Sequence, residues 1–191
     1  MILIINCGSE KVDLIARMVS KDHFELQIVR LDEIKNIDFA NYNGIIISGA
    51  PILLTEIDYS SVLDLFEFIH RINYPILGIC FGHQIIGLLY GAKAFRGHEC
   101  RTDEIIEVIE RNELFDGLDA ILSLREDHCE GITLPNNFIL LAKSRGYGVE
   151  AMKHREKSVY GVQFHPEASG ESGEKIIKNF LKLCKSNRAQ P

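Results

Sequence analysis

The sequence predicts an α/β fold, a single domain with a doubly wound, mostly parallel sheet that carries helices on both faces. Short, continuous apolar runs, which are typical of strands buried on both faces, recur through the first half of the 191 residues. Segments whose apolar residues recur at helical spacing separate these runs. Strands joined in this way form right-handed crossovers, so the helices pack on both faces of one sheet. Neither an internal repeat nor a linker-like stretch divides the chain, and we expect one domain over residues 1–191.

In the first half, strands and helices are predicted to alternate in chain order. The expected strands are residues 2–5, 26–31, 45–47 and 75–79. The first helix follows a Ser9 cap and buries apolar residues that recur along one face. The second, with apolar positions between 62 and 72, must end before Pro75, because a residue that precedes proline avoids helical angles. The third follows Cys80 and ends at Gly91, a residue type that commonly closes helices.

The second half of the chain is poorer in helix signals and is predicted to add further strands to the sheet. Strand-like runs occur at residues 105–109, 138–142, 148–152 and 159–164. A final helix is predicted near the C-terminus, where apolar side chains share one face and lysines lie outside it. Its apolar positions are Ile176, Ile177, Phe180, Leu181 and Cys184.

Composition and charge favour a cytoplasmic protein with an ordinary packed core. Apolar residues make up 46% of the chain and charged residues 25%. With 27 acidic and 21 basic residues the net charge is -6, which repels phosphate backbones and anionic lipid, so no nucleic acid and no membrane is expected as a partner. The five cysteines are scattered without a Cys-x-x-Cys pair, which argues against a disulfide framework or a zinc site, and no metal is expected in the chain. The apolar N-terminus is too short for a signal sequence.

A cysteine stands where a nucleophile would be expected in this fold. The segment Gly78-Ile79-Cys80-Phe81-Gly82 has the G-x-C-x-G spacing of a nucleophile elbow between a strand and a helix. The glycines allow the tight turn, which exposes Cys80 at the end of the strand. A free thiol has a pKa of about 8.5, and a helix N-terminus and a nearby imidazolium would both favour the thiolate. The alternative is that Cys80 is a small buried apolar residue, which the complete strand-turn-helix context disfavours.

A candidate base follows another strand-like run near the C-terminus. His165 ends that run, and Pro166 biases His165 towards an extended conformation. In an extended segment, residues two apart project to the same side, so the Glu167 carboxylate can orient the ring of His165. A lone His-x-Glu pair is more often a surface feature, but with an elbow cysteine it predicts a Cys80-His165-Glu167 triad.

A turn of small residues after a third strand could complete the site. Residues 48–51 read Ser-Gly-Ala-Pro, and the backbone N–H groups of Gly49 and Ala50 could bind a developing oxyanion together with that of Phe81. By itself, this turn would be interpreted as an ordinary loop. Its proposed role in binding the oxyanion depends on convergence, because three strands would end in a nucleophile, a base and a turn of N–H donors. The sequence contains neither a G-x-x-x-x-G-K-[S/T] phosphate loop nor a G-x-G-x-x-G turn, so a step that consumes ATP must occur elsewhere.

Residues 75–84 and 160–167 together resemble the two signatures of class I (triad-type) glutamine amidotransferases, and the resemblance extends in order and spacing over nearly the whole chain. It implies hydrolysis of glutamine to glutamate through a γ-glutamyl thioester on Cys80, with transfer of the ammonia to a synthetase partner. It also implies that Gln84 and the segment around Asp127 and His128 help to hold glutamine.

Within that family, residues 149–154 and 159–164 are most similar to the separate amidotransferase subunits of archaeal-type GMP synthetases. That similarity implies an ATP pyrophosphatase partner that adenylates xanthosine monophosphate (XMP), with ATP and Mg²⁺ on the partner and no cofactor in this chain. The chain departs from the family at Ala50, where glycine is usual, at Asp127, where serine is usual, and after Glu167. These departures leave open a stand-alone γ-glutamyl hydrolase, a subunit that serves another ammonia acceptor, and a regulatory subunit without turnover.

Overall fold

The computed structural model describes residues 1–186, and within them a nine-stranded sheet has the order β2-β1-β3-β4-β11-β10-β9-β6-β7. Neighbouring strands of its first part run parallel. They are β1 (Ile2–Asn6), β2 (Leu26–Arg30), β3 (Gly44–Ile47), β4 (Ile76–Ile79) and β11 (Val159–Val162). The second part continues with antiparallel pairs, formed by β6 (Asp103–Val108), β7 (Ile121–Arg125), β9 (Phe138–Ser144) and β10 (Ala151–His154).

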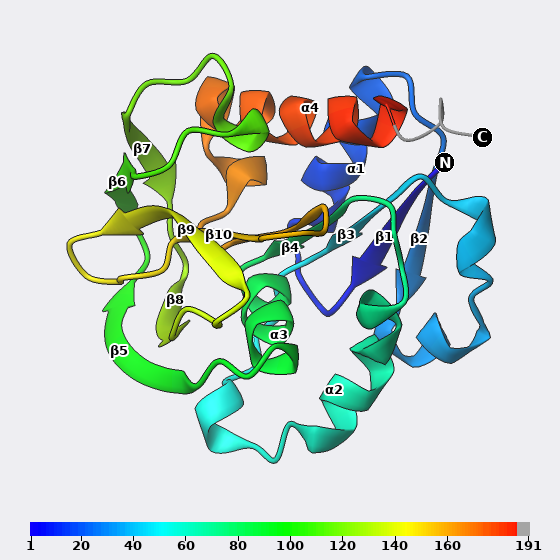
Figure 1. Ribbon diagram of the computed structural model, residues 1–191, viewed down its shortest axis with the longest axis horizontal. Coiled ribbons are helices and arrows are strands. Elements are labelled where there is room, and N and C mark those ends of the chain that lie inside the picture. The colour runs from blue at the N-terminus through cyan, green and yellow to red at the C-terminus, as the bar shows by residue number, and fades with distance from the viewer. Residues whose placement is uncertain (187–191) are drawn as a thin grey trace.

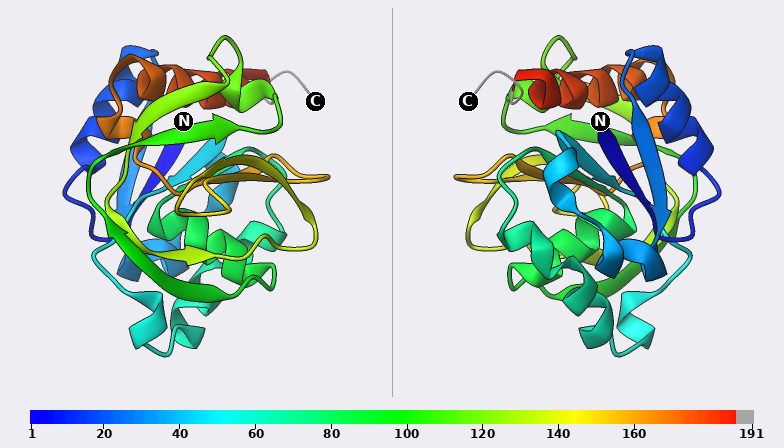
Figure 2. Two further views of the ribbon diagram at one scale, coloured as in Figure 1. Left: turned by 90° about the vertical axis from the view of Figure 1, so that its left-hand side faces the viewer. Right: turned by 90° about the vertical axis from the view of Figure 1, so that its right-hand side faces the viewer.

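Helices cover both faces of this sheet (Figures 1 and 2). One face carries α1 (Val12–Lys21) and α4 (Gly170–Ser186), which pack against each other. The other carries α2 (Ser60–Phe66) and α3 (Phe81–Leu89), which also contact each other. A 3-10 helix (Glu67–His70) continues α2. The predicted α/β class, with helices on both faces and additional strands in the second half, is confirmed.

The parallel strands are apolar along their length because they are buried on both faces. In β1, Ile2 and Ile4 join the core beneath α1 and α4, whereas Leu3 and Ile5 join the core beneath α2 and α3. This alternation follows from the two-residue period of a strand. Within residues 1–186, none of the helices combines the length and apolar character that a bilayer span would need.

The start of α1 differs from the prediction. Ser9 is not the N-cap: Lys11 occupies that position, and its side chain makes no capping hydrogen bond. Instead, the Ser9 hydroxyl accepts the backbone N–H of Lys11 over 3.1 Å. A serine two residues earlier thus closes a local turn that competes with capping, because serine side chains bond readily to nearby backbone.

Three strands were not predicted. A separate two-stranded sheet pairs β5 (Ala94–Cys100) with β8 (His128–Ile132). Strand β5 is mostly exposed and has no apolar alternation from which it could be recognised. Strand β7 does carry a signal, since buried Leu122 and Leu124 alternate with exposed neighbours. The expected strand at residues 148–152 also lies later, at β10.

Candidate active site

Three adjacent parallel strands end at the same edge of the sheet, and each leads into part of the candidate site. Strands β3, β4 and β11 are neighbours in the sheet. The Gly49–Ala50 turn follows β3, Cys80 follows β4, and His165 follows β11. In open α/β sheets ligands bind at this carboxyl edge. A cavity of about 630 Å³ lies there, lined by Gly49, Ala50, Cys80 and His165 among others.

Cys80 has the strained backbone of a nucleophile elbow. Its φ of 51° and ψ of -103° are outside the ordinary regions for a residue with a side chain, and among the described residues only His23 is another non-glycine with positive φ. The flanking glycines are required by space. A Cβ on Gly78 would lie 2.4 Å from the carbonyl carbon of Gly82, and one on Gly82 would lie 2.5 Å from the carbonyl oxygen of Ile47. The tight turn predicted from the spacing is therefore present.

Burial opposes ionisation of the Cys80 thiol. The side chain is 7% exposed, and burial, followed by the negative charges of Glu126 and Glu167, raises the pKa of the thiol to about 12. The backbone N–H of Phe81 at the start of α3 lowers it, but by less. The start of α3 thus favours the thiolate, as expected, but desolvation opposes it and has the larger effect on the pKa.

His165 is held against a carboxylate inside the protein. Its Nδ1 lies 2.7 Å from Oε1 of Glu167, and both side chains are buried. The segment is not extended as expected: Pro166–Ala168 forms a 3-10 turn, which brings Glu167 back towards the ring. Hydrogen bonds to its backbone fix the position of His165. The backbone N–H donates to the carbonyl of Arg125 over 2.8 Å, and the backbone carbonyl accepts the Ser169 hydroxyl over 2.7 Å.

Gly49 lies between the cysteine and the histidine. A Cβ at this position would lie 3.2 Å from Cε1 of His165 and 3.7 Å from Cβ of Cys80, so the two side chains flank the same glycine. The neighbouring Ser48 is fully buried and holds the turn, accepting the Cys7 N–H over 3.0 Å and donating to the Gly49 carbonyl over 2.9 Å. Within residues 1–186, Ala50 is not among the positions with positive φ, so its methyl group causes no backbone strain.

The three residues expected to hold the substrate all line the cavity, but each is already engaged by the protein. Gln84 donates its amide to the Glu130 carbonyl and to Gln163, both over 3.1 Å. The Asp127 carboxylate pairs with Lys11 at 2.8 Å and Arg101 at 2.6 Å. Burial alone would raise the pKa of Asp127, but its hydrogen bond to Lys11, together with the charges around it, lowers the pKa below its ordinary value. The negative charge expected at Asp127 is thus matched by two cations.

Gln163 is a site residue that sequence reasoning missed. It is fully buried, and its side-chain nitrogen lies 3.6 Å from the Cys80 sulfur. Its oxygen accepts from Gln84, so the two amides form a chain that ends at the nucleophile. The signal was present, because Gln163 is a polar residue between two apolar ones, Val162 and Phe164, just before His165. Lys11 and Arg101 had no such signal, since only tertiary structure brings them to Asp127.

The sheet and the arrangement of Cys80, His165 and Glu167 point to one family of enzymes, and the comparison with family models identifies the same family. The family model for glutamine amidotransferase class-I matches residues 3–184, and the chain belongs to this family. Named relatives show which members of this family the chain is similar to. The glutamine-hydrolyzing GMP synthase subunit of Pyrococcus abyssi is 40% identical over 188 residues, covering 96% of this chain and 98% of that protein. The same-named subunit of Methanosarcina barkeri is 36% identical over 96% of each chain.

Solved structures show the same fold. A Thermoplasma acidophilum protein described as a candidate for the same GMP synthase subunit superposes with a TM-score of 0.89 at 29% identity, covering 98% of this chain and 94% of that one. A glutamine amidotransferase from Thermotoga maritima superposes with a TM-score of 0.76 at 20% identity, covering 100% of this chain and 86% of that one, a likeness of fold alone.

Proposed function

We propose that this chain is the glutamine-hydrolysing subunit of a two-subunit GMP synthase, with Cys80 as nucleophile, His165 as base and Glu167 as the group that orients the base. The observation that supports the catalytic assignment is the convergence of Cys80 and the His165–Glu167 pair on one cavity around Gly49. The relatives named as glutamine-hydrolyzing GMP synthase subunits, which match almost the whole chain, support the particular reaction.

In the proposed reaction, the Cys80 thiol is deprotonated as it attacks. His165 removes the proton from sulfur while the sulfur bonds to the side-chain carbonyl carbon of glutamine. Removal of the proton during attack fits the raised pKa of the buried thiol. The negative charge that develops on the carbonyl oxygen is bound by backbone N–H groups of Gly49, Ala50 and Phe81. When the C–N bond breaks, the histidine returns its proton to the leaving nitrogen, and ammonia departs from a γ-glutamyl thioester.

The second half of the reaction regenerates the enzyme. Water replaces ammonia in the site, and His165 removes a proton from it as it attacks the thioester carbon. The carbon–sulfur bond breaks, the sulfur regains its proton from the histidine, and glutamate is released. Glu167 stabilises the imidazolium in both halves because its carboxylate lies 2.7 Å from Nδ1.

The ammonia acceptor is XMP, bound on a separate synthetase subunit. That ATP pyrophosphatase subunit holds ATP and Mg²⁺ and activates XMP, whereas this chain needs no cofactor for glutamine hydrolysis. The absence of a phosphate-loop motif from the sequence supports this division. Gln84, Asp127 and His128 border the cavity in which glutamine would lie and form its wall through their internal bonds.

The test is reconstitution of this chain with an ATP pyrophosphatase subunit, XMP, ATP and Mg²⁺. We expect Cys80→Ala to abolish GMP formation from glutamine, because no thioester can form, while GMP formation from added ammonium salts continues. Cys100→Ala, at a buried cysteine outside the cavity lining, is the matched control and retains both activities.

Loss of both activities in folded Cys80→Ala would contradict the proposed division of the reaction between the two subunits. Full glutamine turnover without any partner would instead indicate a stand-alone hydrolase.

A further inference from the structure

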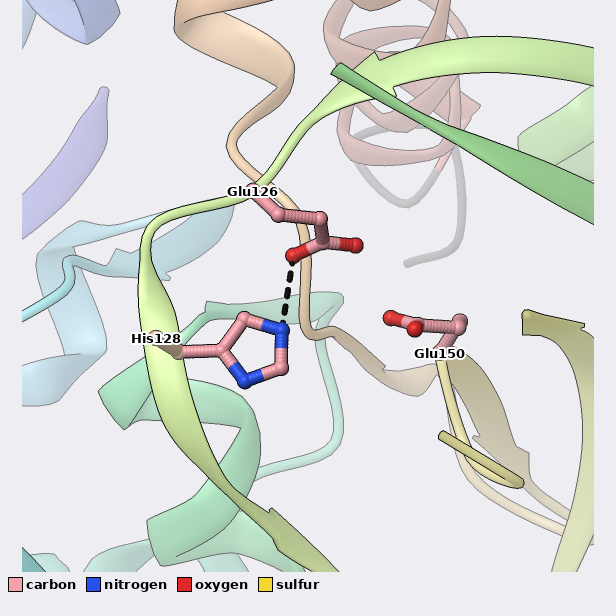
Figure 3. Close-up of side chains that lie close together, drawn as sticks. All are labelled: Glu126, His128 and Glu150. Carbon is pink, nitrogen blue, oxygen red and sulfur yellow. Dashed lines mark ion pairs between the residues drawn. The ribbon is translucent and has the colours of Figure 1, made fainter. Parts of the chain in front are cut away.

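A cluster of three ionisable side chains lies outside the set of residues that the proposed reaction uses for catalysis. Glu126, His128 and Glu150 are 1%, 7% and 1% exposed, and their ligand atoms all lie within 4.8 Å of one another. Figure 3 shows the two carboxyl groups and the imidazole ring pointing toward a common space. They come from three segments: Glu126 follows β7, His128 begins β8, and Glu150 precedes β10.

The ring of His128 is oriented like that of a metal ligand. Its Nδ1 lies 2.8 Å from the backbone carbonyl of Glu130, and since a carbonyl can only accept, Nδ1 carries the hydrogen of this bond. Metal-binding histidines commonly donate one ring nitrogen to a carbonyl in this way, which leaves the other free to bind the ion. That other nitrogen, Nε2, faces Oε2 of Glu126 at 2.9 Å.

Four atoms of the cluster make no hydrogen bond of regular geometry within residues 1–186, although the Glu126 carboxyl group lies close to both the Glu150 carboxyl group and the His128 ring. These atoms are both carboxylate oxygens of Glu126, Oε2 of Glu150 and Nε2 of His128. The 2.9 Å approach of Nε2 to Glu126 is an ion pair only when the ring carries a second proton (Figure 3). Buried polar atoms without regular hydrogen bonds are rare, and two carboxyl groups buried side by side can both ionise only beside a compensating positive charge. Two ligand atoms that bind one cation at about 2.1 Å each lie about 3–4 Å apart, which matches this approach.

We propose that Glu126, His128 and Glu150 bind one divalent transition-metal cation, of the class of Zn²⁺ or Mn²⁺. Two carboxylates and a dication give a neutral buried site, and the imidazole favours a transition metal over Mg²⁺ or Ca²⁺. This proposal departs from the sequence-based expectation of no metal in the chain, which depended on the scattered cysteines.

The backbone around the three ligands is fixed, as a metal site requires. The N–H of Glu126 donates to Thr102 over 2.9 Å, and that of Glu150 donates to Ala142 over 2.9 Å. The carbonyl of Glu150 accepts the N–H of Gln163 over 2.8 Å. A bound cation would therefore join β7, β8 and β10 behind the wall of the cavity, and would act by holding that wall in place.

The first experiment measures binding to the full chain after treatment with a chelator. Mn²⁺ and Zn²⁺ are titrated separately by calorimetry, with Zn²⁺ also tested in Cys80→Ala so that binding to the active-site thiol is excluded. We expect one cation per chain, and an affinity at least about tenfold lower in Glu150→Gln and in Glu126→Gln, which keep the side-chain size but lose the charge. Glu107→Gln, at an exposed glutamate on β6, is the control and binds like the parent chain.

A second measurement does not depend on variants that fold. Crystals of the parent chain soaked in MnCl₂ should show an anomalous peak between the three side chains. Any of three outcomes would overturn the proposal. The first is the absence of stoichiometric binding by the parent chain, and the second is anomalous peaks only outside the three side chains. The third is binding that both glutamine variants leave unchanged, which would indicate that shared protons neutralise the two carboxylates.

Discussion

At the scale of single residues, the proposed nucleophile Cys80 combines a strained backbone with a thiol whose pKa is raised. The positive φ of Cys80 holds the sulfur at the cavity, while burial and two nearby carboxylates raise the pKa of the thiol to about 12. Because alkylating and oxidising agents attack the thiolate, the raised pKa predicts slow modification of Cys80 in the absence of glutamine.

A pH dependence of alkylation follows. Below its pKa, the thiolate fraction of a cysteine rises tenfold per pH unit, so the raised pKa predicts that the rate of modification of Cys80 by iodoacetamide rises about 100-fold from pH 7 to pH 9, without a plateau. The measurement is peptide mass spectrometry of the Cys80 peptide over time, without glutamine. A rate that is already maximal at pH 7 would show that an imidazolium–thiolate pair forms at rest.

Glu167 provides the second prediction at this scale. Glu167→Ala should lower the turnover of saturating glutamine by about 10²- to 10⁴-fold and leave measurable activity, because the base remains but loses its orientation and its charge partner. Cys80→Ala should leave none. Steady-state rates of the two variants make the comparison, and Glu171→Ala, at an exposed glutamate in the first turn of α4, is the control. Equal losses in the two triad variants would contradict an orienting role.

At the scale of elements, the strand β4, the elbow and the helix α3 work as one unit packed tightly on β3. Gly82 approaches the backbone of Ile47 so closely that a methyl group would meet the carbonyl oxygen at 2.5 Å and the side chain at 2.9 Å. A backbone atom of a central strand cannot move away as the end of a side chain could. The elbow thus depends on glycine for packing as well as for the turn.

Gly82→Ala should therefore destabilise the protein by about 1–3 kcal/mol, although alanine favours helices, because overpacking against backbone exceeds the gain in propensity. Urea denaturation followed by circular dichroism gives the free energy of unfolding. Gly148→Ala is the matched control, since a Cβ there meets nothing within 4 Å and φ is not positive. A Gly82 variant as stable as the control would show that α3 can shift away from β3.

At the scale of the whole molecule, the C-terminal helix joins the two halves of the chain. Helix α4 packs against α1 from the first half, and its buried Asn179 donates to the carbonyls of Leu114 at 3.1 Å and Asp116 at 2.8 Å in the second half. The segment that carries Glu167 leads directly into this helix. The position of α4 therefore bears on the geometry of the candidate triad.

Asn179→Ala should lower the free energy of unfolding by about 1–3 kcal/mol, because it removes hydrogen bonds to the buried Leu114 carbonyl and to the Asp116 carbonyl. Lys178→Ala, at the neighbouring exposed position of α4, controls for the change in helix propensity. The denaturation midpoints of both variants and the parent chain are compared in urea. A midpoint for Asn179→Ala equal to that of the control would show that water replaces the lost bonds.

Much of the fold and the candidate site could be predicted from local patterns. The buried strands of the parallel part were visible as apolar runs because both of their faces are covered. The elbow at Cys80 and the pairing of His165 with Glu167 followed from spacing, since each depends on a few consecutive residues. The exposed strand β5 could not be predicted in this way, because its residues are placed by pairing with β8 rather than by burial.

By itself, the sequence determined the alternation of strands and helices in the first half, the strained turn and the identities of the proposed nucleophile, base and orienting carboxylate. Only the tertiary structure decided that burial raises the pKa of the Cys80 thiol, that Asp127 pairs with Lys11 and Arg101, and that Glu126 and Glu150 lie beside His128. The reason is physical: backbone conformation and periodicity act between near neighbours in the chain. Desolvation and charge depend on every group within a few ångströms, wherever it lies in the sequence.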